Sequence, residues 1–123
     1  MENDLSLEEM IKLGARVNFW SKVNRRMRDS ELTLEEGYRG YSPYGSIVIK
    51  LIKATYGSIG SSYKISAFKE FSEGNVMLGR AGHDEEILKN FYDKVSQATE
   101  KRIEQKLDTE KYSAIKKVRD FIR

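Results

Sequence analysis

The chain has 123 residues, with 22 Lys and Arg against 19 Asp and Glu, and a formal net charge of +3. Its length predicts a single domain, 1–123, which is large enough to bury a hydrophobic core without cross-links to stabilise it. The lack of cysteine excludes disulfides, thiolate metal sites and cysteine nucleophiles. An apolar content of 39% with 33% charged residues suits a small helical domain. We therefore expect a mainly α fold, a bundle of about five helices.

Two further exclusions concern the membrane and secretion. No apolar run approaches the roughly 18 residues that a membrane span needs, because the longest, Ile47 to Ile52, is broken by Lys50. The Met-Glu-Asn-Asp start lacks the basic and apolar regions of a secretory signal. We expect a cytoplasmic protein with no membrane partner.

The first predicted element is a helix over 6–28. Ser6 and Glu9 have the spacing of a capping box. Apolar residues then recur every three or four positions: Met10, Leu13, Val17, Trp20, Val23 and Met27. Gly14 weakens such a helix and indicates close packing against another element. Lys22, Arg25 and Arg26 fall outside the apolar stripe, where they form either a solvated face or a phosphate-contacting one.

The basic, Tyr- and Gly-rich middle, 37–73, follows an acidic connector at 29–36. Its first part, 37–69, holds five cations and five tyrosines and no acid. The run 46–56 reads as a helix capped by Ser42 or as a strand rich in β-branched residues, and we favour the helix, with a second short helix over 62–73. The alternative is a β-hairpin at 46–72, which would make the fold α+β. A helix places Lys50 and Lys53 on one face, whereas a strand separates them.

The C-terminal helical segment covers 84–122, after a predicted loop at 74–82. Apolar positions from Leu88 to Ile122 follow helical spacing, and no Gly or Pro interrupts them. Asp108 and Thr109 can cap a separate last helix, but no Gly or Pro separates the two helices, so one bent helix of about 40 residues is the other option. Its apolar stripe would either wrap the core of its own chain or pair with a copy, which makes a homo-oligomer a second expectation.

Enzymatic constellations are sparse. The single histidine, His83, excludes a His-rich metal site, and the serines lack the context of an activated nucleophile. We expect no enzyme, no cofactor and no metal. Two Gly-rich loops, 57–62 and 79–83, precede predicted helix starts, where backbone N–H groups favour anions. They make Ser61, Ser62, Arg80 and His83 candidate anion-binding residues.

The acid-free middle suggests a function, because nucleic-acid grooves combine cations for phosphates with aromatic faces for stacking. We expect a small nucleic-acid-binding regulatory or accessory protein of phage or bacterial type. Its predicted site residues are Lys22, Arg25, Arg26, Arg39, Tyr41, Tyr44, Lys50, Lys53 and Lys64. One alternative is a protein-binding inhibitor or accessory factor without enzymatic activity, with Tyr and Arg as anchors. The other is a small nucleotide- or anion-binding protein that uses the two Gly-rich loops.

Trp20 and the stretch Gly-Tyr-Arg-Gly-Tyr-Ser-Pro at 37–43 resemble the corresponding part of phage late-gene antiterminators. The spacing differs, and the downstream helix-turn-helix of that family is missing. The resemblance therefore implies no role for any individual residue.

Overall fold

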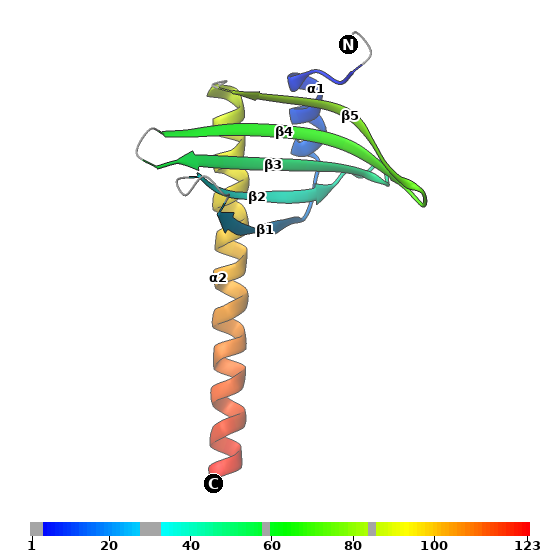
Figure 1. The fold of residues 1–123 in the computed structure, drawn as a ribbon. Helices are drawn as coiled ribbons and strands as arrows, with labels where there is room; N and C mark the ends of the chain where they lie inside the picture. Colours follow the sequence, from blue (N-terminus) through cyan, green and yellow to red (C-terminus); the bar gives the residue numbers. More distant parts are fainter. Residues whose placement is uncertain (1–3, 28–32, 58–59, 84–85) are drawn as a thin grey trace.

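The computed structural model describes residues 4–27, 33–57, 60–83 and 86–123, with the backbone alone for residues 24–27, 33 and 83. Its elements in chain order are α1 (Leu7–Ala15), β1 (Trp20–Met27), β2 (Thr33–Tyr41), β3 (Ile47–Tyr56), β4 (Gly60–Phe71), β5 (Gly74–His83) and α2 (Glu86–Ile122). Each strand pairs antiparallel with the next, so the sheet order is β1-β2-β3-β4-β5. Figure 1 shows both helices on the same face of this sheet. In the described part of the chain no helix lies on the opposite face, which we call the open face.

The expected five-helix bundle is wrong, and the α+β alternative with a hairpin at 46–72 is confirmed. Strands β3 and β4 form that hairpin in a continuous register from Ile47↔Lys69 to Tyr56↔Gly60. The signals read as a helix start belong to a turn, in which Ser42 Oγ accepts a hydrogen bond from the Tyr44 N–H at 3.1 Å. Strands β2 and β4 provide hydrogen-bonding partners for the backbone of β3 on both sides. Its β-branched side chains also favour the strand conformation.

The N-terminal helix is much shorter than the predicted 6–28. The capping box is confirmed, since Ser6 Oγ accepts from the Glu9 N–H and the Glu9 carboxylate accepts from the Ser6 N–H. The helix nevertheless ends at Ala15, and Trp20–Met27 is β1. Helical spacing of apolar residues continued past the real helix, but pairing with β2 overrides that local pattern.

Three other segments also differ from expectation because they are strands. The second short helix, 62–73, is most of β4, and the loop at 74–82 is β5. Part of the connector at 29–36 belongs to β2, and residues 29–32 lie outside the described part of the chain. Glycine-rich sequence that reads as loop here forms a strand because β4 supplies its hydrogen-bonding partner.

The core lies between the sheet and the two helices. Its fully buried side chains come from α1, from the two central strands and from α2: Met10, Ile49, Leu51, Ile65, Ala67 and Leu88. Gly14 of α1 packs against α2 as predicted, because an added Cβ would lie 2.8 Å from the Phe91 ring. Both helices are therefore fixed on one sheet face, which leaves the other face free.

Of the two options for the C-terminal segment, the single long helix is the one observed, and a separate last helix capped by Asp108 and Thr109 is wrong. Helix α2 runs unbroken for 37 residues. Its buried residues, Leu88, Tyr92, Val95 and Thr99, all belong to its first half. Figure 1 shows the second half extending well beyond the edge of the sheet.

Candidate functional site

Strand alternation divides the acid-free middle between two faces. Neighbours in a strand point to opposite faces, and Ile49 and Leu51 face the helices. Lys50 therefore lies on the open face, whereas Lys53 faces the helix side, where its Nζ lies 5.9 Å from the centre of the Tyr63 ring. The two lysines are separated, as expected for a strand.

Four cations meet on the open face, one from each of four consecutive strands. Arg39 of β2 pairs with Lys50 of β3, Lys50 pairs with Ser66 of β4, and Ser66 pairs with Arg80 of β5. This row crosses strands spaced about 4.8 Å apart. Lys64 of β4 lies two residues from Ser66 on the same face. We call Arg39, Lys50, Lys64 and Arg80 the cationic face.

Two aromatic rings adjoin the cationic face. Tyr41 and Phe68 flank Val48 in the register across β2, β3 and β4. The Arg39 guanidinium lies 5.7 Å from the centre of the Tyr41 ring and 5.6 Å from that of Phe68. Tyr41 is 54% exposed, whereas Phe68 is half-buried, so Tyr41 is the more accessible of the two rings.

The charges on this face are unequally compensated. Arg39 donates through Nη2 to Glu70 Oε2 at 2.8 Å. Among the described residues, the side chains of Lys50, Lys64 and Arg80 have no hydrogen-bond or ion-pair partner. Glu35, which shares this face near the start of β2, already takes part in an interaction of its own. The face is therefore net positive, and three of its cations are available to a ligand.

A hollow of about 480 Å³ is lined by residues of β4 and β5. Its lining is Lys64, Ile65, Arg80, Ala81 and Gly82. Gly82 keeps it open, since an added Cβ would lie 3.2 Å from Lys64 Cγ. Two of the free cations thus border one hollow.

Two of the other predicted nucleic-acid residues, Tyr44 and Lys53, do not join this face. Tyr44 lies exposed in the β2–β3 turn, 66% accessible, and Lys53 faces the helix side. Arg25 and Arg26 belong to β1, but their side chains lie outside the described residues. The sequence analysis assigned Arg80 to a loop. The pairing of Ser66 with both Lys50 and Arg80 places it on the face of Lys50.

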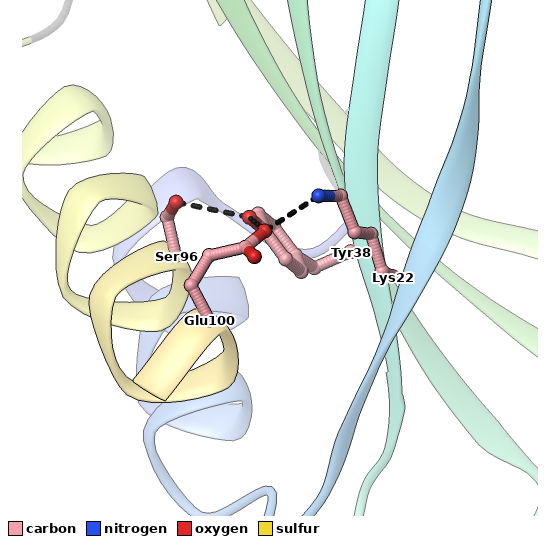
Figure 2. A network of polar contacts seen from close by, with 4 residues as sticks. All are labelled: Lys22, Tyr38, Ser96 and Glu100. Carbon is pink, nitrogen blue, oxygen red and sulfur yellow. Dashed lines mark hydrogen bonds and ion pairs between the residues drawn. The ribbon is translucent and has the colours of Figure 1, made fainter. Parts of the chain in front are cut away.

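Lys22 forms an ion pair with α2 and is not part of the cationic face. Figure 2 shows it meeting Glu100 of α2, at 2.7 Å between Nζ and Oε1, beside Tyr38. The Tyr38 hydroxyl donates to the same Glu100 oxygen at 3.1 Å and lies 2.9 Å from Ser96 Oγ. The hydrogen bond from Lys22 lowers the pKa of Glu100, and the one to Glu100 raises the pKa of Lys22. This network joins α2 to the sheet on the helix side.

The two segments predicted as anion-binding loops are largely strand. Residues 60–62 belong to β4 and 79–83 to β5, while 58–59 lie outside the described residues. Ser61 Oγ lies 3.2 Å from Thr55 Oγ1, and Ser62 Oγ donates to the Tyr56 hydroxyl at 3.5 Å. His83 ends β5, and its side chain lies outside the description. Arg80 belongs to the cationic face, and Ser62 lies on the same open face, two residues from Lys64 in β4.

Comparisons with known protein families, curated proteins and solved structures gave no match. Within the described ranges, no three His, Asp or Glu side chains gather in a way that could hold a metal ion. Neither helix has an apolar stretch long enough to cross a membrane, as far as the described residues show.

Proposed function

We propose that this protein binds single-stranded nucleic acid on the open face of its sheet. The observation that carries the proposal is the cationic face, in which one cation from each of β2, β3, β4 and β5 lies beside two aromatic rings. Strand alternation and register bring these side chains together although they are distant in the sequence.

The roles follow from chemistry. Lys50, Lys64 and Arg80 provide unpaired positive charge for phosphates, which supplies most of the affinity in sequence-independent binding. Tyr41 and Phe68 provide π-faces on which bases stack, a contact worth about 1–3 kcal/mol per base. Ser66 lies between Lys50 and Arg80 in the register, and its small side chain leaves room for a strand of nucleic acid to cross the sheet.

The geometry favours a single strand over a duplex. A duplex is read by a helix or two-stranded ribbon inserted into its major groove, whereas the cationic face spreads over four strands. Sheets that bind RNA present aromatic side chains to unstacked bases. A chain with splayed bases can reach both the rings and the row of cations at once.

A polarisation titration tests this directly. We expect fluorescently labelled single-stranded DNA or RNA of about 20 nucleotides to bind, with the logarithm of affinity falling against the logarithm of salt with a slope near −2 to −3, since about three or four phosphates are neutralised. A duplex of the same length should bind more weakly. Absence of binding at about 50 mM salt contradicts the proposal.

The site is tested by a triple substitution, Lys50→Ala, Lys64→Ala and Arg80→Ala. It should weaken binding by at least about tenfold and flatten the salt dependence. The matched control replaces three exposed lysines of α2, Lys89, Lys94 and Lys101, by Ala, with the same loss of charge. Equal losses in both variants would show that net charge, and not this face, determines binding.

The sequence analysis left two alternative functions, binding of a nucleotide or anion and binding of a protein partner. The nucleotide or anion hypothesis stays a prediction, although residues 60–62 and 79–83 lie in strands and not in the expected loops. A protein partner stays a prediction, and failure of the titration with normal folding would favour it.

A further inference from the structure

The second half of α2 carries large apolar side chains that nothing in the described chain covers. Arg102 is the last residue of α2 for which a contact with the sheet domain is seen, where its Nη2 donates to the Trp20 carbonyl at 2.8 Å. Beyond Ile103 no residue is buried. Leu107, Val118 and Phe121 are 59%, 58% and 88% exposed.

These side chains share one face of the helix. Leu107, Ala114, Val118 and Phe121 follow one another at spacings of seven, four and three residues, so all four fall within one stripe at 3.6 residues per turn. An isolated helix of this length is marginal in water, because helical stability in proteins comes mostly from packing of an apolar face. The stripe needs a partner surface.

The charges of the projecting half indicate what that partner is. The part nearer the sheet, 104–110, holds three acids and one lysine, whereas 111–123 holds five cations and one acid. Two copies side by side in parallel would place like charges together. Two antiparallel copies would place the acidic part of each beside the basic part of the other, which satisfies the flanking charges of a paired helix.

We propose that a second copy of this chain covers the stripe, antiparallel, with the two-fold axis close to Ala114. In this register Glu110 faces Lys117 of the partner subunit, and Asp108 faces Arg119 of the partner subunit. Leu107 packs between the partner's Val118 and the partner's Phe121, and the small Ala114 lets the helices approach at the axis. The paired segment is about 30 Å long, and one sheet lies at each of its ends.

Solution mass and two matched substitutions test the pairing. Sedimentation of the intact chain at about 200 µM should give twice the monomer mass, falling toward the monomer on dilution by mass action. Val118→Glu places a charge in the stripe and should leave only monomer. Tyr112→Glu adds the same charge on the opposite side of the helix, so the dimer should persist. A monomer for the unchanged protein at this concentration overturns the proposal.

A charge exchange tests the direction and register. Glu110→Lys and Lys117→Glu each create two like-charged pairs per dimer, and each should weaken association by about fivefold or more. The double variant Glu110→Lys/Lys117→Glu should restore it, whereas Lys116→Glu, which lies away from the stripe, should have little effect. A double variant as weak as the single ones overturns this register.

Cross-linking gives an independent result, because the chain has no cysteine of its own. A mixture of Glu110→Cys and Lys117→Cys chains treated with a short bis-maleimide should give mainly the mixed product. Efficient linkage of Glu110→Cys chains to themselves would show a parallel arrangement and overturn the proposal.

Discussion

Lys22 of β1 and Glu100 of α2 form an ion pair of 2.7 Å across the boundary between sheet and helix. Tyr38 donates to the same carboxylate, so one acidic side chain connects α2 with two strands. The pair lies at the last turns of α2 that contact the sheet. Its position means that it holds the point where α2 leaves the domain.

Glu100→Gln should lower stability only modestly, by up to about 1 kcal/mol at neutral pH, because both charged side chains are nearly half exposed and screened by solvent. The pKa of Glu100 is below its usual 4.5 in the folded protein. Its contribution is therefore complete above the unfolded pKa and is lost as pH falls through the lower folded value. Denaturant unfolding from pH 7 to pH 2.5 should show the two proteins converging in acid. Glu104→Gln, which removes the same charge further along α2, should match the unchanged protein throughout.

The buried Tyr92 should make the stability of the fold depend on pH in alkaline solution. Its ring is buried, with centroids 5.4 Å from Tyr38 and 5.2 Å from Tyr63. Burial raises the pKa of Tyr92 above the usual 10, so above pH 10 the unfolded chain releases a proton that the folded chain retains. Stability should therefore fall as pH rises past 10. Tyr92→Phe should remove part of this slope, whereas Tyr112→Phe, at an exposed position, should leave it unchanged; identical slopes in all three proteins would contradict the assignment.

Two glycines of β5 should respond differently to the same substitution. An alanine Cβ at Gly79 would lie 2.7 Å from the Leu5 carbonyl oxygen, and Leu5 also donates its N–H to Leu78 at 2.8 Å. Gly79→Ala should therefore displace the segment before α1 and cost about 1–3 kcal/mol in unfolding free energy.

The control is Gly82→Ala on the open face, where the nearest atom, 3.2 Å away, belongs to the flexible Lys64 side chain. It should cost clearly less. Thermal unfolding compares them, and equal losses would mean that the Leu5 contact is unimportant.

Glu70→Gln should increase affinity for single-stranded nucleic acid. It removes the carboxylate that holds Arg39 at 2.8 Å and frees a fourth cation for phosphates. We expect about threefold to tenfold tighter binding and a salt slope steeper by nearly one phosphate contact. Glu73→Gln, an exposed turn residue with the same change in charge, is the control. The proposed site is contradicted if both variants gain equally.

Local signals predicted parts of the two helices but not the strands. The Ser6–Glu9 capping box is local and was predicted correctly. The uninterrupted C-terminal helix is one of the two options that the sequence left open. The stripe from Met10 to Met27 misled, because Trp20 and Val23 keep helical spacing although they lie in β1. Nothing local distinguishes such a strand from a helix until β2 is there to pair with it.

The candidate site was predicted only in part. Arg39, Tyr41, Lys50 and Lys64 were expected and do share a face. Arg80 was assigned to a loop, and Lys22 and Lys53 were included although they face the helix side. Whether a residue lies on the open face depends on its odd or even position within its strand, and an error of one position moves it to the other face.

The sequence by itself determined the excess of cations in 37–69, the lack of cysteine and the helical character of the C-terminal segment, since these depend on composition and on spacing within one element. Tertiary structure alone decided which cations stand together. The register of four strands places Arg39, Lys50 and Arg80 in one row, and the packing of both helices on the other face leaves that row uncovered. Hydrogen bonds between distant segments set both arrangements, and a pattern within one segment does not encode them.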